Sequence, residues 1–227
     1  MVDLAKQAIL INNSVLRNTH IDVYGIGSVG SHLVLGLAKL GVESISVWDY
    51  DTVNEDNISA QAFGLEHVGL KKTEALFDLV KRQTGIKIEL NNLEIDEETD
   101  LEPEINSIQC SCVDSLKARK IIFDKLVGLP VYWLDSRIGG FDHQYYFLKL
   151  DDKQSTDKYI KTLKPIPGMA YELKCGEKCS IGNNLMIVSE LMANIVRLIN
   201  GIEPNKKYIS NFLWFNNINS LPKVIKC

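Results

Sequence analysis

Between residues 20 and 136 the apolar positions switch repeatedly from the alternation of a strand to the spacing of a helix. Apolar runs rich in β-branched residues predict strands at 20–25, 44–49, 87–93, 105–112 and 131–136. Helical spacing predicts helices at 31–40, 70–83 and 115–127. Strand, glycine turn, helix and strand in that order form a βαβ unit, which implies a parallel sheet. The repeated alternation therefore predicts a doubly wound α/β fold.

The pattern changes after residue 137, where the regular alternation of strand and helix stops. The later segments predict an added strand at 143–150, an irregular charged stretch at 151–180, a long apolar helix at 183–200 and a hairpin at 209–225. Residues 1–16 predict a short amphipathic helix. We therefore expect a Rossmann-like, mainly parallel sheet with antiparallel strands near the C-terminus. With no internal repeat and no linker, residues 1–227 are expected to form one domain.

Composition places the chain among ordinary globular proteins, with 45% hydrophobic and 24% charged residues. A net charge of −4 and a pI near 5.6 give no basic face for nucleic acid. No apolar run reaches the length of a membrane span. The N-terminus carries Asp3 and Lys6 and lacks a small-residue cleavage site, so it does not resemble a secretory signal. Five cysteines without such a signal predict reduced thiols and a cytoplasmic location.

A glycine-rich turn, YGIGSVGSH at residues 24–32, follows the first predicted strand and opens the first predicted helix. Its G-x-G-x-x-G residues, Gly25, Gly27 and Gly30, together with Ser28, are expected to hold nucleotide phosphates at the start of that helix. Asp49 ends the second predicted strand, where a carboxylate accepts hydrogen bonds from ribose hydroxyls. These residues predict a nucleotide site but do not distinguish a dinucleotide from a nucleoside triphosphate.

The residues after Asp49 carry a more specific pattern. They are, in order, Asp49, Asp51, Val53, Asn57, Gln61, Gly69 and Lys72. This run resembles the ThiF/HesA/MoeB adenylyltransferases, the prokaryotic relatives of ubiquitin-activating enzymes. CVDSLKAR at 112–119 is similar to the strand-end D…R motif of that family, and WLDSRIGGF at 133–141 is similar to a variant in short ThiF-type proteins. The resemblance extends over roughly residues 20 to 200.

The resemblance implies a reaction in which a C-terminal carboxylate attacks the α-phosphorus of ATP. The products would be an acyl-adenylate and pyrophosphate, formed with ATP and Mg²⁺ as cofactors. By position in the motifs, Lys72 and Asn57 would bind the phosphates and Asp114 would hold Mg²⁺. Asp49 would bind the ribose, and Asp51 and Gln61 would belong to the same nucleotide site. The implied partner is a small ubiquitin-like or sulfur-carrier protein, or a peptide, and the family suggests a homodimer.

Each of these residues also has an alternative without function. Without the motif, Lys72 would be interpreted as an ordinary solvated lysine on a helix, and Asp114 as the N-cap of the helix that follows it. In the same way, Asn57 and Gln61 would be interpreted as ordinary loop residues, and Asp51 as a residue that fixes the turn. The order of the motifs favours the nucleotide site over a set of coincidences.

The chain departs from the family at its catalytic arginines. Ala60 stands where the family has an arginine before the glutamine, and the N-terminal segment holds only Lys6, with Arg17 after it. In phosphoryl transfer, such arginines contribute about 10³–10⁵ in rate. Either another cation substitutes, with Arg137, Arg17 and Lys71 as candidates, or the chain is a weakly active or non-catalytic ATP-binding partner of an activating complex. The retained Lys72 and Asp114 favour substitution.

Four of the five cysteines fall into two groups. Cys110 and Cys112 share one side of a predicted strand and are expected to be buried and inert. Cys175 and Cys179 are separated by three residues, and the lack of a second pair argues against structural zinc. Cys179 stands beside Lys178 and just before a predicted helix, which favours a thiolate, so it is a candidate nucleophile for the activated carboxyl group.

Residues 138–180 contain the pair Gly139–Gly140, the single Gly176 and a charged, irregular stretch, and they are a candidate crossover or flap over the acyl-adenylate. The leading hypothesis is therefore an ATP-dependent adenylyltransferase. One alternative is an NAD-dependent oxidoreductase, although the chain offers no clear set of residues for hydride transfer. The other is a nucleotide-binding partner without catalysis, for which Ala60 is the main argument.

Overall fold

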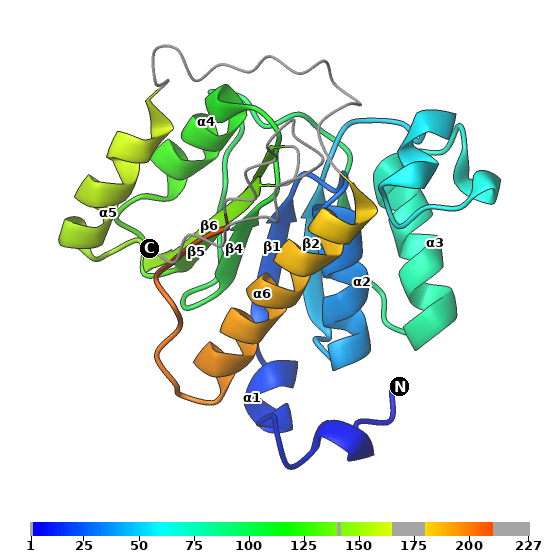
Figure 1. Ribbon diagram of the computed structural model, residues 1–227, viewed down its shortest axis with the longest axis horizontal. Coiled ribbons are helices and arrows are strands. Elements are labelled where there is room, and N and C mark those ends of the chain that lie inside the picture. The colour runs from blue at the N-terminus through cyan, green and yellow to red at the C-terminus, as the bar shows by residue number, and fades with distance from the viewer. Residues whose placement is uncertain (1, 140–141, 165–179, 211–227) are drawn as a thin grey trace, which may run out of the picture.

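A seven-stranded sheet forms the centre of the computed structural model, which describes residues 2–139, 142–164 and 180–210 (Figure 1). Its strands are β1 (His20–Tyr24), β2 (Ser44–Trp48), β3 (Glu89–Asn91), β4 (Ile108–Ser111), β5 (Tyr132–Gly139), β6 (Asp142–Lys149) and β7 (Lys207–Ser210). Their order across the sheet is β3-β2-β1-β4-β5-β6-β7. The pairs from β3 to β5 are parallel, whereas β6 is antiparallel to both β5 and β7. The predicted mainly parallel sheet with antiparallel strands near the C-terminus is confirmed.

Helices cover both faces of this sheet, as the doubly wound fold requires (Figure 1). They are α1 (Asn13–Arg17), α2 (Gly30–Leu40), α3 (Lys72–Thr84), α4 (Leu116–Leu126), α5 (Lys153–Tyr159) and α6 (Ile181–Ile199). Side chains of α2, α3 and α6 share one hydrophobic cluster, and those of α4 and α5 share another. None of the helices in the described part of the chain combines the length and the apolar character that crossing a bilayer requires.

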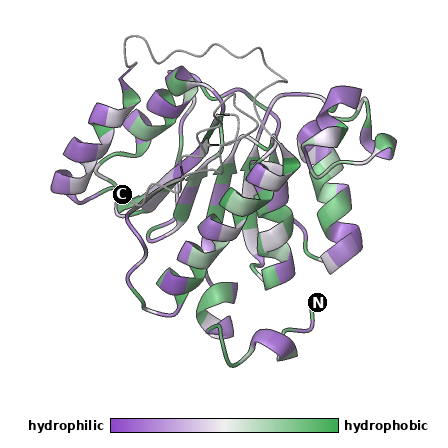
Figure 2. Ribbon diagram, viewed as in Figure 1, coloured by the Kyte–Doolittle hydropathy of each residue, from purple (hydrophilic) through white to green (hydrophobic). Residues whose placement is uncertain are grey.

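Alternation along β5 shows how one strand supplies both clusters. Leu134 points into the cluster under α2 and α6, and its neighbour Trp133 points into the cluster under α4 and α5. Both side chains are fully buried, because an inner strand of an α/β sheet is covered by helices on both faces. In Figure 2 the hydrophobic residues accordingly concentrate on the strands and on the inward faces of the helices.

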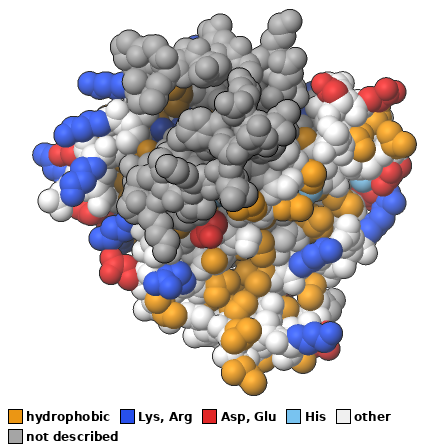
Figure 3. Space-filling model, viewed as in Figure 1, with side chains coloured by type: hydrophobic (Ala, Val, Ile, Leu, Met, Phe, Trp, Pro, Cys, Tyr) orange, Lys and Arg blue, Asp and Glu red, His pale blue; other side chains and the backbone are white. Residues whose placement is uncertain are grey.

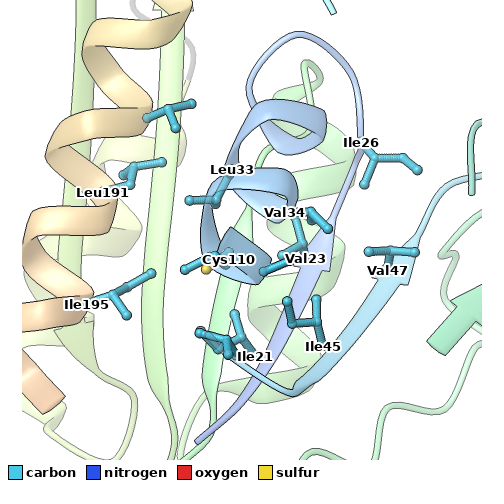
Figure 4. Close-up of a cluster of buried hydrophobic side chains, with 14 of the residues drawn as sticks. Ile21, Val23, Ile26, Leu33, Val34, Ile45, Val47, Cys110, Leu191 and Ile195 are labelled. Carbon is cyan, nitrogen blue, oxygen red and sulfur yellow. The ribbon is translucent and has the colours of Figure 1, made fainter. Parts of the chain in front are cut away.

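Helix α6 packs its apolar face over the centre of the sheet and beside α2. Leu191 and Ile195 of α6 lie near Leu33 of α2 and Ile21 of β1, and all four are fully buried (Figure 4). The Ser180 hydroxyl accepts a hydrogen bond from the Asn183 N–H and caps the helix. The predicted long apolar helix at 183–200 is therefore confirmed, with its start two residues earlier.

Two predictions of local structure are wrong. The N-terminal segment forms a 3₁₀ turn, Ala5–Gln7, and the separate helix α1 instead of one helix, because the Asn12 side chain caps α1 by accepting from the Val15 N–H. The stretch expected to be irregular contains α5, capped by Asp152, which accepts from the Gln154 N–H, and the 3₁₀ turn Ile160–Leu163. Many charged residues on the exposed face of α5 hide its helical pattern in the sequence.

The loop expected after Asp49 contains two further 3₁₀ turns, Glu55–Ser59 and Leu65–His67. Other predictions fall outside the described residues. These are Cys175, Cys179, the parts of the candidate flap at 140–141 and 165–179, and the hairpin beyond residue 210. Of the hairpin predicted at 209–225, only residues 209 and 210 are described, and they are the end of β7, which pairs with β6.

Truncation of a leucine in α6 tests how much the packing of this helix stabilises the fold. Leu191→Ala removes a fully buried side chain and leaves a cavity, so we expect the free energy of unfolding to fall by about 2–5 kcal/mol. Leu65→Ala changes the same residue type in the 3₁₀ turn Leu65–His67, at a position that is 75% exposed, and it should change stability by no more than about 0.5 kcal/mol. Urea denaturation measures both. Equal losses would show that α6 does not form the cover described above.

Candidate functional site

The sheet changes direction of winding between β1 and β4, which are neighbours in the sheet although β2 and β3 separate them in the sequence. In open α/β sheets, ligands bind at such a switch point, in the crevice beyond the carboxyl ends of the strands. The glycine turn leaves β1 at this point and leads into α2, and the loop after β4 faces it. The fold therefore places the predicted phosphate-binding turn at the position where such sheets bind ligands.

Backbone packing explains two glycines of the turn, and free space explains the third. Gly25 has a φ of +81°, and a Cβ on Gly30 would lie only 2.0 Å from the carbonyl oxygen of Gly25. A Cβ on Gly27, by contrast, would meet no atom of the described residues within 4 Å. Gly25 and Gly30 thus serve the protein's own close packing, whereas Gly27 leaves room for a ligand to approach the backbone.

The carboxylate of Asp49 joins the glycine turn to the loop that follows β2. One oxygen accepts a hydrogen bond of 2.9 Å from the Ile26 N–H, and the other accepts one of 2.8 Å from the Asp51 N–H. Asp49 directly follows β2, as predicted, and its own N–H donates to the Asn91 carbonyl after β3. The same side chain therefore fixes two segments and lies beside the turn.

Lys72 continues this chain of contacts from Asp51. Its ammonium lies 2.7 Å from the Asp51 carboxylate, and its N–H donates to the Asp51 carbonyl over 3.0 Å. Only 7% of Lys72 is exposed, although it is the first residue of α3. The alternative of an ordinary solvated lysine is wrong for Lys72, whereas its neighbour Lys71 is exposed and donates to the Tyr50 carbonyl.

Asn57 and Gln61 lie on and just after the 3₁₀ turn Glu55–Ser59. The side-chain oxygen of Asn57 accepts from the Asn54 N–H, and its side-chain nitrogen donates to the Asp56 carboxylate, so this side chain closes the turn. The Gln61 side-chain oxygen is enclosed and has no hydrogen-bond partner among the described residues. A buried acceptor without a donor is unfavourable, and a bound ligand that donates would satisfy it.

The position of the missing arginine lies between α2 and α6. The carbonyl of Ala60 accepts from the Asn184 amide at 3.0 Å, and the His32 ring lies 3.3 Å from the same oxygen. Burial lowers the pKa of His32, which disfavours a cation at this ring. Neither Ala60 nor these neighbours therefore provides the positive charge that the family arginine would bring.

Asp114 lies in the short loop between β4 and α4, across from the glycine turn. A Cβ on Gly25 would lie 3.0 Å from the Val113 nitrogen, so the two backbones are in close contact next to Asp114. The cap of α4 is Ser115, whose hydroxyl accepts from the Ala118 N–H, and the alternative that Asp114 caps this helix is wrong. The Asp114 side chain is exposed.

Arg137 lies on β5 in a buried polar network. Its Nε donates to the Asp135 carboxylate at 2.8 Å, and its two terminal nitrogens donate to the carbonyl and hydroxyl of Thr162 at 2.9 Å each. Asp135 is fully buried and also accepts from Arg119 and from the Tyr159 hydroxyl. The guanidinium of Arg137 therefore holds β5 to the end of the 3₁₀ turn that follows α5.

Cys110 is buried, as expected, whereas Cys112 is only partly buried. Burial raises the pKa of Cys110 well above its usual value, and it raises that of Cys112 to about 12. Both groups therefore stay protonated at neutral pH and are poor nucleophiles. Cys179, the predicted reactive thiol, lies outside the described residues.

The structure thus brings the glycine turn, Asp49, Asp51 and Lys72 into one connected group, with Asp114 on the facing loop. The sequence did not single out Ser31, whose hydroxyl donates to the Gly27 carbonyl and accepts from the Ala62 N–H. The position of Ser31 directly after Gly30, the third glycine of the turn, is the sequence signal that could have identified it. Nothing local in the sequence indicated the Asn184 amide, which reaches this region from α6.

Comparison with known protein families matches residues 7–226 to the ThiF family. The chain belongs to this family. The match confirms the resemblance drawn from the run between Asp49 and Lys72. The ThiF-family chain is 32% identical over 119 residues to "Adenylyltransferase and sulfurtransferase MOCS3" of Caenorhabditis briggsae, covering 51% of this chain and 30% of the relative. It is 27% identical over 201 residues to "Probable adenylyltransferase/sulfurtransferase MoeZ" of Mycobacterium tuberculosis, covering 82% and 49%.

Solved structures with the same fold include Escherichia coli MccB with ATP, at a TM-score of 0.71 and 18% identity. That alignment covers 93% of this chain and 65% of the MccB chain. The ThiF-family chain therefore spans about a third to a half of the two curated relatives and less than two thirds of MccB. At this identity the MccB structures establish a shared fold.

Alanine at two positions of the glycine turn tests the division of roles described above. Gly30→Ala places a methyl group against the Gly25 carbonyl, so we expect a loss of about 1–3 kcal/mol in the free energy of unfolding. Gly27→Ala places the same methyl group in open space and should change stability by no more than about 0.5 kcal/mol. Denaturant unfolding distinguishes them. A larger loss for Gly27→Ala would contradict the packing of the turn.

Proposed function

We propose that this ThiF-family chain is an ATP-dependent adenylyltransferase. It would activate the C-terminal carboxylate of a small ubiquitin-like or sulfur-carrier protein, or of a peptide, as an acyl-adenylate with release of pyrophosphate. The observation that carries this proposal is the connected group at the switch point, where Asp49 joins the glycine turn to Asp51 and Asp51 holds Lys72. An NAD site would need the carboxylate and the turn but not the buried lysine.

The nucleotide fits the residues present. The open space at Gly27 and the start of α2, which receives no side-chain cap from the described residues, suit phosphate oxygens. Asp49 has oxygen lone pairs left for ribose hydroxyls beyond its two backbone contacts. Lys72 has three donors and gives one to Asp51, so it can also reach a phosphate without losing its ion pair.

Magnesium fits the donor set on the facing loop. Mg²⁺ in such sites is held by one or two carboxylates together with the phosphates of the substrate and water. Asp114 offers an exposed carboxylate in this place, and the described residues contain no cluster of three or more metal-binding side chains that would form a separate cage. The ion would supply charge neutralisation on the phosphates. The chain's own residues would position the two reacting anions, and no general base is required, because the substrate is already a carboxylate.

The missing arginine at Ala60 requires a substitute cation, which we assign to Lys71. Arg137 donates to Asp135 and Thr162, and Arg17 pairs with Glu43 at 3.1 Å. Lys71 is exposed, donates to the neutral carbonyl of Tyr50 and directly precedes Lys72. Arg137 would reach a phosphate only by leaving its present partners. Cys179 stays a prediction as the acceptor of the activated carboxyl group.

The proposed partner is a small protein or a peptide that binds beside the nucleotide. One of the solved MccB structures supports this class of partner, because it holds MccA together with AMPCPP. Relatives named "Ubiquitin-like modifier-activating enzyme 5" support a ubiquitin-like substrate instead, with 26% identity over 153 residues for the rice protein.

Exposed apolar side chains gather along α6 and below it (Figure 3), among them Ile181, Leu185 and Met186, and they support the expected homodimer. A weakly active partner within an activating complex is the second candidate, favoured by Ala60.

Calorimetric titration tests the nucleotide. We expect ATP with Mg²⁺ to bind and NAD not to bind, since Lys72 complements a triphosphate tail. Lys72→Ala should weaken ATP binding at least about tenfold, because its buried ammonium would be the main cation for the phosphates. Lys87→Ala, at an exposed lysine before β3, removes the same charge and should leave binding unchanged. Tighter binding of NAD than of ATP would sink the proposal.

Restoration of the family arginine tests the substitute cation. Since Lys71 already supplies positive charge in this proposal, Ala60→Arg should raise the rate of ATP–pyrophosphate exchange by less than about tenfold. A gain near the range of about 10³–10⁵ found for catalytic arginines in phosphoryl transfer would show that no substitute is present. That outcome would favour the weakly active partner.

A further inference from the structure

The loop that carries Asp114 is held on the side of the glycine turn by backbone contacts. The Cys112 N–H donates to the Tyr24 carbonyl at 2.8 Å, and the Val113 nitrogen lies where a Cβ on Gly25 would be only 3.0 Å away. These contacts fix the two residues before Asp114. They do not by themselves fix the peptide between Val113 and Asp114, which sets the direction of the carboxylate.

Arg119 makes that second connection. It lies on the first turn of α4, and only 3% of it is exposed. One terminal nitrogen donates both to the Val113 carbonyl and to the Ser136 carbonyl, the latter at 2.9 Å, and its Nε donates to the Asp135 carboxylate. A single guanidinium therefore links the carbonyl next to Asp114 to strand β5.

Asp135 keeps this guanidinium in one orientation. The carboxylate is fully buried and accepts from Arg119 on one oxygen and from Arg137 and Tyr159 on the other. A planar guanidinium that donates in several directions at once has little freedom to rotate. A lysine in its place has one nitrogen on a flexible stem and cannot reach Val113, Ser136 and Asp135 together in this geometry.

We infer that Arg119, oriented by Asp135, is a positioning residue that aims Asp114 at the metal-chelated nucleotide. The inference rests on the proposed function, because it concerns the same site. Arg119 does not touch the ligand and acts only through the Val113 carbonyl. Side chains that orient a metal-binding carboxylate typically contribute about 10–100-fold to metal affinity. A role confined to packing would instead lower stability and leave the Mg²⁺ dependence of binding as it is.

The test is the ratio of ATP affinities measured by calorimetry with Mg²⁺ and with a chelator. In the unaltered chain, Mg²⁺ should tighten ATP binding through Asp114. In Arg119→Lys, which keeps the charge, we expect this gain to fall by about tenfold while binding without Mg²⁺ stays within about twofold. Tyr159→Phe is the matched control, since it removes a hydrogen bond of 2.9 Å to the same Asp135 and leaves Arg119 in place. Its gain should be unchanged.

The outcomes separate the inference from the proposed function. If the unaltered chain does not bind ATP, the proposed function fails and the inference fails with it. If the unaltered chain binds ATP with a gain from Mg²⁺ and Arg119→Lys keeps the whole gain, the inference alone is overturned. Should Arg119→Lys not fold, Asp135→Asn provides the second measurement, because it preserves shape and removes the charge that orients the guanidinium. A decrease of about threefold or more in the gain of ATP affinity from Mg²⁺ supports the inference, and an unchanged gain overturns it.

Discussion

The carboxylate of Asp49 is the interaction on which the geometry of the site depends. It accepts one N–H from the glycine turn after β1 and another from the loop after β2, so it fixes the end of two neighbouring strands relative to each other. Because Asp51 is fixed in this way, Lys72 finds its partner at the start of α3 and stays buried at the edge of the crevice. Without this carboxylate, neither the open turn at Gly27 nor the ammonium would have a defined place.

The opposite wall of the crevice depends on close packing and on one buried ionic network. Gly25 and Gly30 allow the turn and the backbone of residues 112–113 to approach more closely than any side chain would permit. On the far side, Arg119 and Asp135 connect that backbone to β5. A buried charge pair of this kind is weak support for stability, because removing the ions from water offsets most of their attraction. Its value in this fold is the fixed direction of the loop.

Much of the fold could be predicted from the sequence, because buried parallel strands and amphipathic helices leave periodic patterns that depend only on neighbouring residues. The succession of strands and helices along the chain and the glycine turn followed from these patterns, and Asp49, Asp114 and Lys72 were proposed from the motifs. Helix α5 was missed because its exposed face is highly charged. The contacts of Arg119 with Asp135, and of Asn184 with the Ala60 carbonyl, join segments far apart in the chain. No local pattern encodes such pairs, since they exist only once the sheet has brought β5 and α6 to the crevice.

The most direct measurement is a crystal structure of the chain with a non-hydrolysable ATP analogue and Mg²⁺. The account predicts ribose oxygens within hydrogen-bond distance of Asp49, phosphates over Gly27 and beside Lys72, and the ion next to Asp114. An analogue bound elsewhere, or a crevice that stays empty at saturating nucleotide, would contradict it.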